Sequence, residues 1–234
     1  MVITMNKSFI EWRKKQNLRT VTLPNKDKFY IDLMNLENSW SGRMDIWGLG
    51  NTFIMEAEQL LINAIELFEI GYFDCAYYSL RSAVDISTTL VFLADMPKKV
   101  RAKYSNAWKK TRKFPMQRQM LEQLCEKGNI FADMIEKMPD FFAEAKELSA
   151  ALNKYVHKQG FRHFYISRNH PANGIRQDNF IKNFELNLKK SIGVVAVMRL
   201  AIDPFPILLR DEDILYRCFD TITEPYSDAF VFEY

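Results

Sequence analysis

The residues best suited to chemistry lie in one stretch of the chain, from Phe141 to His163. Asn153 and His157 are four residues apart, which on a helix places them one turn apart on the same face. A histidine can move protons near neutral pH, and an asparagine can orient the imidazole or bind a phosphate oxygen. We therefore interpret His157 and Asn153 as candidate catalytic residues.

The sequence around these two residues predicts the helix that positions them. Its apolar side chains recur at alternating spacings of four and three residues, which is typical of one buried stripe. They are Phe141, Ala145, Leu148, Leu152 and Tyr155. Gly160 is expected to stop the helix. Because His157 lies on a different, polar face, we expect its ring to be displayed rather than packed in the core.

A cation for such a site is available at Arg81. A helix is predicted from Tyr72 to about Ala94, apolar on nearly every side except for one polar stripe. The stripe consists of Asp74, Tyr78, Arg81, Asp85 and Thr88. Arg81 and Asp85 are four residues apart and can pair within the helix. Two interpretations stay open, namely an ion pair that satisfies a partly buried charge and a role for Arg81 in the site.

A strongly basic stretch runs from Lys98 to Arg118. It holds nine basic residues and no acidic ones, although the whole chain carries a net charge of only +3. Tyr104, Trp108 and Phe114 lie between the charges, a composition that suits a phosphate backbone with stacked bases. The alternative is a solvated helix face whose aromatic residues pack inward. The candidate nucleic-acid ligands are Lys99, Arg101, Lys109, Lys110 and Arg112 here, with Lys154, Lys158 and Arg162 near His157.

Other kinds of site find no support in the sequence. The three cysteines are widely spaced and form no CxxC pair, and the three histidines lie six and seven residues apart without acidic partners, so we expect neither a metal site nor a disulfide. No glycine-rich phosphate loop or hydrolase motif is present, and we expect no cofactor. No apolar run is long enough to span a bilayer and no signal peptide is evident, which predicts a cytoplasmic protein without membrane association.

The elements divide the chain into three parts. Residues 1–50 are expected to form an N-terminal extension or cap that holds a short hairpin around Pro24 to Asp27, although a helix there is also compatible with the sequence. Residues 51–203 are expected to form a helical bundle, and residues 204–234 a short helix with a docked tail. The predicted helices begin at Asn51 or Thr52, Tyr72, Met116, Asn129, Phe141, Gln177 or Asp178, and Asp211.

Five or more helices with little strand signal predict an all-α fold, an antiparallel bundle. The pair of helices NTFIMEAEQLLINAIELFEIGYFDCAYYSLRSAVDISTTLVFLADM, followed later by LSAALNKYVHKQGF, resembles HEPN domains. These are helical bundles of prokaryotic toxin–antitoxin and phage-defence systems. The resemblance spans roughly residues 51 to 200. Its more specific part is the histidine near the end of a late helix, His157, followed by Gly160.

HEPN ribonucleases carry an arginine and an adjacent polar residue shortly before this histidine. His157 matches the histidine and Asn153 the polar position, but Leu152, Ala151 and Ala150 stand where the arginine is expected. Either the domain has lost catalysis, or the cation comes from elsewhere, with Arg81, Lys146, Lys154 and Arg162 as candidates. Cleavage of RNA through its own 2′-hydroxyl would need the histidine to move protons and the cation to stabilise the phosphate. The resemblance also implies a homodimer and an antitoxin or defence partner.

Two functional hypotheses follow. The first is a HEPN-like protein that binds RNA or another polyanion and acts as a metal-independent ribonuclease, with the His157 face and the basic stretch on one continuous positive surface. The second is a non-catalytic HEPN-like interaction or scaffold module that binds a partner protein or a nucleotide. The missing arginine favours the second hypothesis, in which the protein is not catalytic. The basic stretch with its aromatic residues favours nucleic acid as the partner.

Overall fold

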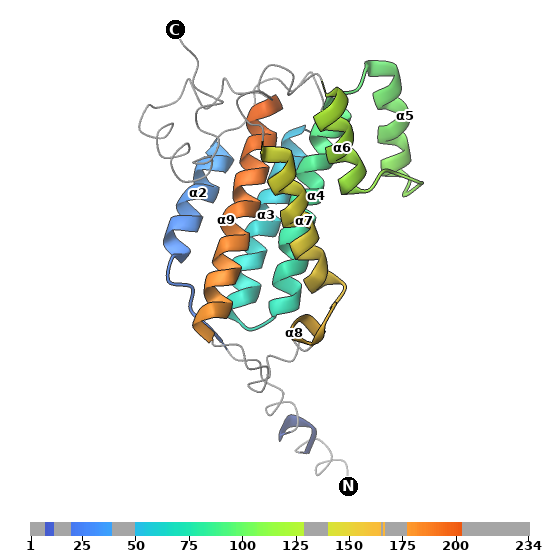
Figure 1. Ribbon diagram of the computed structural model, residues 1–234. Helices are drawn as coiled ribbons and strands as arrows, with labels where there is room; N and C mark the ends of the chain where they lie inside the picture. The colour runs from blue at the N-terminus through green and yellow to red at the C-terminus, as the bar shows by residue number, and fades with distance from the viewer. Residues whose placement is uncertain are drawn as a thin grey trace.

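A computed structural model describes residues 8–11, 20–38, 50–128, 140–164, 166 and 177–202. These residues form an all-α structure without strands (Figure 1), which confirms the predicted fold class. The helices are α2 (Lys26–Asn38), α3 (Gly50–Glu69), α4 (Phe73–Ala94), α5 (Lys98–Lys109), α6 (Gln117–Lys127), α7 (Phe141–Val156), α8 (Phe161–Phe164) and α9 (Gln177–Ile202).

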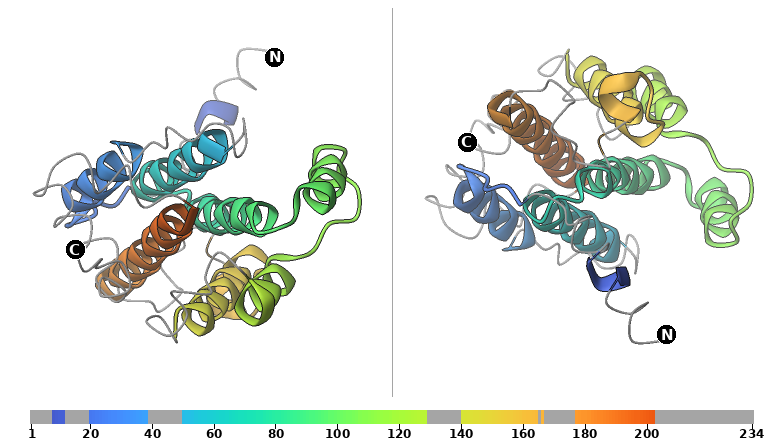
Figure 2. Two further views of the ribbon diagram at one scale, coloured as in Figure 1. Left: turned by 90° about the horizontal axis from the view of Figure 1, so that it is seen from above. Right: turned by 90° about the horizontal axis from the view of Figure 1, so that it is seen from below.

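Helix α4 lies at the centre of the bundle. It packs against α3, α9, α7 and α6 (Figure 2), which explains why its sequence is apolar on nearly every side. Aromatic rings connect the layers: Tyr77 of α4 stacks on Tyr155 of α7 with ring centroids 3.6 Å apart, and Phe68 of α3 stacks on Phe184 of α9 at 3.7 Å. The central helix therefore places its polar stripe beside neighbouring helices, where Thr88 is buried and the other four side chains are partly exposed.

Helix α7 has the predicted phase but ends earlier than expected. All five residues of its apolar stripe are buried, which confirms that Asn153 and His157 lie on another face. The helix ends at Val156, and Lys158 takes the left-handed conformation with a φ of 51°. The Gln159 amide donates to the Lys154 carbonyl and the Lys158 amide to the Tyr155 carbonyl, which is a Schellman motif. The expectation that Gly160 stops the helix is thus corrected, since Lys158 does so two residues earlier.

The predicted hairpin in residues 1–50 is wrong, and the alternative helical interpretation is confirmed. Residues Lys26–Asn38 form α2 because Phe29, Leu33 and Leu36 recur at helical spacing and are all buried. The start of the helix is fixed by Glu185 of α9, whose carboxylate accepts bonds of 3.1 and 3.0 Å from the backbone and side chain of Asn25. As a result α2 packs on α3 and α9 as a covering helix.

The remaining boundaries agree closely with the sequence. Helix α3 begins at Gly50, one residue before the predicted cap, and α4, α6 and α9 match their predicted extents to within a residue or so. The helices expected at residues 129–138 and 211–219, most of the loop at 166–176, and the C-terminal tail lie outside the described residues. Among the helices that the structure describes, none combines the length and the apolar character needed to cross a bilayer.

Candidate site at the junction of helices α4 and α7

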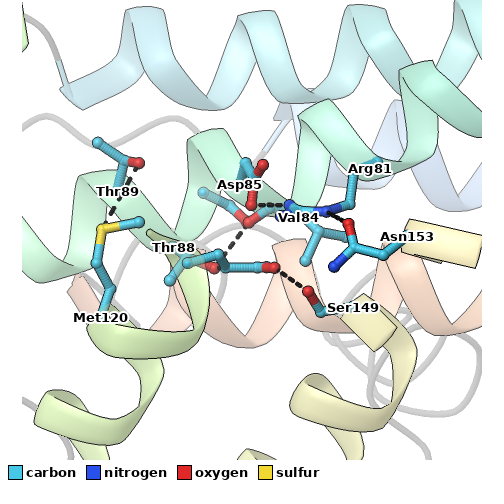
Figure 3. A network of polar contacts seen from close by, with 10 residues as sticks. Arg81, Val84, Asp85, Thr88, Thr89, Met120, Ser149 and Asn153 are labelled. Carbon is cyan, nitrogen blue, oxygen red and sulfur yellow. Dashed lines mark hydrogen bonds and ion pairs between the residues drawn. The ribbon is translucent and has the colours of Figure 1, made fainter. Parts of the chain in front are cut away.

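Arg81 and Asn153 meet between α4 and α7. The Arg81 Nε atom donates a hydrogen bond of 2.9 Å to the Asn153 Oδ1 atom, across 72 residues of sequence (Figure 3). Burial lowers the pKa of Arg81, whose side chain is 17% exposed, yet a guanidinium stays charged in proteins. The structure thus joins two of the three residues that the sequence analysis selected as catalytic candidates.

Arg81 also forms an ion pair with Asp85, one turn further along α4 (Figure 3). The predicted pairing of these two residues is therefore confirmed. Because Asp85 and Asn153 both hold the guanidinium, Arg81 ties α4 to α7 whether or not it contacts a ligand. The Asp85 side chain is 38% exposed, so the site opens to solvent on the Asp85 side.

His157 occupies the C-cap of α7, and its side chain is exposed as predicted. Two contacts fix this end of the helix on α4. The Tyr78 hydroxyl donates to the Val156 carbonyl over 3.3 Å, and the Lys158 Nζ atom lies 3.2 Å from the Asp74 carboxylate. His157 follows Asn153 by one turn, so the imidazole lies one turn of α7 beyond the Arg81 contact.

A second polar chain lies deeper in the same junction. The Ser149 hydroxyl donates to the side-chain Oε1 atom of Gln117, and the side-chain Nε2 atom of Gln117 donates to the Thr88 hydroxyl over 3.4 Å. The Thr88 hydroxyl in turn donates to the backbone carbonyl of Val84 over 2.7 Å. All three side chains are buried. The sequence analysis missed Gln117, although a glutamine at the start of a helix whose next apolar residues are buried is a signal for such a contact. This chain is satisfied internally and holds α4, α6 and α7 together.

The other cations predicted near His157 differ in their availability. The Lys154 side chain is exposed, whereas Lys158 is engaged by Asp74. The side chain of Arg162 lies outside the described residues. Of these three lysine and arginine candidates, Lys154 is therefore the one that the structure shows available to a ligand.

The basic stretch forms α5 and the turn that follows it. Eight of its nine basic side chains are exposed, and seven of these eight form no ion pair or hydrogen bond within the described ranges; the seven are Lys98, Lys99, Lys103, Lys109, Lys110, Arg112 and Lys113. We call these seven residues the α5 basic surface. Arg118 lies outside it, in α6, where it pairs with Glu122 at 2.9 Å.

Arg101, which the sequence analysis grouped with the nucleic-acid ligands, has a structural role. Its Nη2 atom donates to the carbonyls of Ala94 and Met96, over 2.8 and 2.9 Å. These carbonyls belong to the C-terminal end of α4, where a cation also interacts favourably with the helix dipole. Arg101 therefore caps α4 and directs its charge inward.

Helix α5 and the end of α7, where His157 is the C-cap residue, lie toward opposite ends of α4 (Figure 1). Tyr78, which contacts the end of α7, and Ala94, which leads to α5, are 16 residues apart in the same helix. At a rise of about 1.5 Å per residue they are separated by about 24 Å. The two regions that the first hypothesis expects on one continuous surface are therefore set apart along α4.

No metal site accompanies either region in the part of the chain that the structure describes. Within those residues no three His, Cys, Asp or Glu side chains are grouped so that they could hold a metal ion. Comparisons of the chain with known protein families, with curated proteins and with solved structures find no match.

Proposed function

We propose that the chain is a HEPN-like helical protein that binds RNA or another polyanion. The observation that supports this most strongly is the α5 basic surface, whose seven exposed cations have no acidic neighbour between Met96 and Arg118. Exposed cations without local counter-charges gain free energy by displacing the counterions of a phosphate backbone. The charge of the α5 basic surface is thus the basis for the proposed partner. The resemblance of the α3, α4 and α7 sequences to HEPN domains is the basis for the proposed family.

Binding is tested by fluorescence anisotropy with a labelled single-stranded RNA at 50 and 200 mM salt. A triple variant, Lys99→Glu, Lys103→Glu and Lys110→Glu, should lose most of the affinity. A control with the same change in net charge is Lys28→Glu, Lys182→Glu and Lys190→Glu, whose exposed positions lie on α2 and α9, away from α5. Equal loss in both variants would show that net charge alone is responsible and would refute a site on α5.

A metal-independent ribonuclease is a second candidate, favoured by the contact between Arg81 and Asn153. In this mechanism His157 takes the proton from the RNA 2′-hydroxyl, and the 2′-oxygen attacks the adjacent phosphorus to form a 2′,3′-cyclic phosphate. The bond from phosphorus to the 5′-oxygen breaks, and the leaving 5′-oxygen takes a proton from solvent water. Arg81 supplies the cation that the motif position lacks and stabilises charge on the phosphate oxygens. Asn153 holds the guanidinium on the same side of α7 as the imidazole.

Cleavage of a labelled RNA pool in the presence of EDTA tests this candidate. We expect His157→Ala to abolish chelator-resistant cleavage and Arg81→Lys to reduce it by at least tenfold, because a lysine cannot bond both Asn153 and a phosphate in the same geometry. Arg118→Lys serves as a control, since Arg118 forms a comparable ion pair in α6. RNA that stays intact with the wild-type protein would leave the non-catalytic module, binding a partner protein or a nucleotide, as the better interpretation.

The resemblance to HEPN domains also bears on assembly. It implies a homodimer in which the α7 ends of two chains face each other, and an antitoxin or defence partner. Sedimentation of the purified protein tests the first of these directly. A monomer at micromolar concentration would remove the dimer from the proposal without affecting RNA binding on α5.

A further inference from the structure

We propose that the α5 basic surface binds single-stranded RNA, with Trp108 as the residue on which a base stacks. This inference rests on the proposed binding of RNA or another polyanion and specifies the form of RNA that is bound. It depends on which aromatic side chain of the basic stretch stays open to solvent, and on where the cations lie relative to that side chain.

The three aromatic side chains of the basic stretch differ in their availability to a ligand. Tyr104 and Phe114 contact each other, and both make edge-to-face contacts with Phe92 of α4, at 5.9 and 6.0 Å between ring centroids. Both are half-buried and pack α5 and its turn onto the core. Trp108, in contrast, is 39% exposed. In this stretch, which the structure describes throughout, Trp108 is therefore the aromatic residue best placed to receive a base.

Trp108 is anchored by a single printed ring contact. Its ring centroid lies 4.8 Å from that of Phe53 of α3, and Phe53 is 5% exposed. A ring that the core already holds in place loses little conformational freedom when a base stacks on its open part. The bases of a duplex are stacked on one another, whereas unpaired bases can turn out onto an aromatic side chain. The exposed part of Trp108 therefore favours a single strand.

Cations gather directly after Trp108. Helix α5 ends in a Schellman motif, in which the Thr111 amide donates to the Trp108 carbonyl over 3.1 Å and the Arg112 amide to the Ala107 carbonyl over 2.9 Å. Four exposed cations follow Trp108 within five residues; they are Lys109, Lys110, Arg112 and Lys113. The stacking residue and most of the phosphate-binding groups thus share the C-terminal end of α5 and its turn.

The number of cations also suits one strand. Helix α5 has 12 residues, which span about 18 Å. One strand carries a phosphate roughly every 3.4 Å, so about five phosphates lie along that length. The α5 basic surface holds four cations within the helix and three in the turn. These cations are sufficient to neutralise a short segment of one strand.

The outward side of α5 argues against an anionic membrane as the partner. Residues two or five positions away from Tyr104, which faces the bundle, lie on the opposite side of the helix; they are Lys99, Ala102, Asn106 and Lys109. Val100 and Trp108 are exposed, but they lie one turn before and one turn after Tyr104, toward the bundle. Helices in a membrane interface present a wide apolar face to the lipid, and the outward side of α5 has only one small apolar residue.

The test uses anisotropy titrations at 100 mM salt with a labelled, unstructured RNA of about 16 nucleotides and with its duplex. We expect the single strand to bind at least threefold more tightly than the duplex. Trp108→Leu keeps an apolar contact to Phe53, and it should lose about five- to tenfold in affinity for the single strand and less than twofold for the duplex. Tyr72→Leu is the control, because Tyr72 is 48% exposed at the other end of α4, and it should change neither affinity.

Tryptophan fluorescence provides a direct signal of stacking. Addition of the single strand should quench the emission of the wild-type protein and of Tyr72→Leu, and this quenching should be largely lost in Trp108→Leu. Circular dichroism of each variant shows whether a loss of binding reflects loss of helix.

The outcomes separate this inference from the proposed function. Tighter binding of the duplex, or a Trp108→Leu variant that binds the single strand as well as the wild-type protein does, would overturn the inference while leaving RNA binding intact. Absence of binding to every RNA would refute the proposed function as well. Binding to phosphatidylserine vesicles without binding to RNA would overturn both in favour of a membrane surface.

Discussion

At the scale of single residues, Glu58 shows how the bundle changes a common side chain. Glu58 lies on α3 and is 6% exposed. Burial, and to a lesser degree the negative charge of Glu37 on α2, raises its pKa from 4.5 to about 7. The folded protein thus holds a proton on Glu58 that the unfolded chain releases at lower pH.

This pKa shift has a definite sign in the pH dependence of stability. Because the folded pKa lies above the unfolded one, the free energy of unfolding should fall as pH rises from about 4.5 to about 7, and then stay level. Glu58→Gln should remove this dependence and stabilise the protein at pH 8 by about 1 kcal/mol, after allowance for solvent screening. Urea unfolding at pH 4, 6 and 8 measures both the pH dependence and the stabilisation. Glu56→Gln serves as a control at an exposed position on the same helix. An unchanged pH profile in Glu58→Gln would contradict the assignment.

The sequence predicted the burial and pairing of some side chains well and could not predict those of others. The buried stripe of α7 and the pairing of Arg81 with Asp85 follow from spacing within one helix, so local periodicity was sufficient. Glu58 was not part of the predicted face of α3. Its burial in part reflects α2, whose Glu37 is its charged neighbour, and the position of α2 was not predictable from α3.

At the scale of elements, the end of α7 depends on a strained lysine. Lys158 has a φ of 51° and follows the C-cap His157, a position that glycine usually occupies because a side chain costs about 1 kcal/mol there. The ion pair with Asp74 of α4 offsets part of this cost. The strain and the ion pair therefore act at the same residue, next to the candidate catalytic histidine.

Removing the ion pair should reveal the strain. In an Asp74→Asn background, Lys158→Gly should stabilise the protein by about 1 kcal/mol, because glycine adopts the left-handed conformation freely. In the wild-type background the gain should be smaller, since the ion pair is lost as well. Thermal unfolding of the wild-type protein, the two single variants and the double variant gives the coupling free energy between Asp74 and Lys158. A destabilisation by Lys158→Gly in both backgrounds would show that the Lys158 side chain contributes more than its ion pair.

The cap of α4 provides a second element-scale prediction. Arg101→Ala should lower the free energy of unfolding by about 1 to 2 kcal/mol, because the bonds to the Ala94 and Met96 carbonyls are lost. Lys103→Ala, an exposed position on the same helix, should have almost no effect. Chemical denaturation of both variants makes the comparison. Similar stabilities would mean that solvent replaces the arginine at the end of α4.

The elements were predictable to the extent that their signals were local. Helices α4, α7 and α9 were predicted from periodicity, and all three are long. The region around Pro24 was ambiguous because short apolar runs on both sides of a turn sequence suit a hairpin as well as a helix. Tertiary contacts decided the outcome there, through the hydrogen bonds of Asn25 to Glu185, 160 residues away.

At the scale of the whole molecule, the two candidate regions are separated by much of the length of α4. The sequence analysis placed Arg81 near His157 through the resemblance, and the contact of Arg81 with Asn153 agrees with that placement. It also expected the basic stretch on the same surface. The sequence did not indicate which end of the bundle the basic stretch and the His157 stretch would each reach. Their positions depend on the directions in which α4, α5 and α7 run.

This separation predicts a dependence on RNA length for the ribonuclease candidate. About 24 Å corresponds to about seven nucleotides at roughly 3.4 Å each. The triple α5 variant should therefore reduce kcat/KM severalfold on an RNA of about 20 nucleotides, through KM, and leave cleavage of a five-nucleotide RNA unaffected. Equal effects on both lengths would show that the α5 basic surface acts on the His157 region by another route.

The attachment of α5 has a consequence for the order in which the molecule opens. Helix α5 has no buried residue and contacts the bundle chiefly through α4, whereas α4 is enclosed by four helices. Regions with few buried contacts exchange their amide hydrogens through local opening, at a free energy well below that of global unfolding. The amides of α5 should exchange early and those of α4 last, so the helix with the highest exposed charge is also a separable unit of the native state.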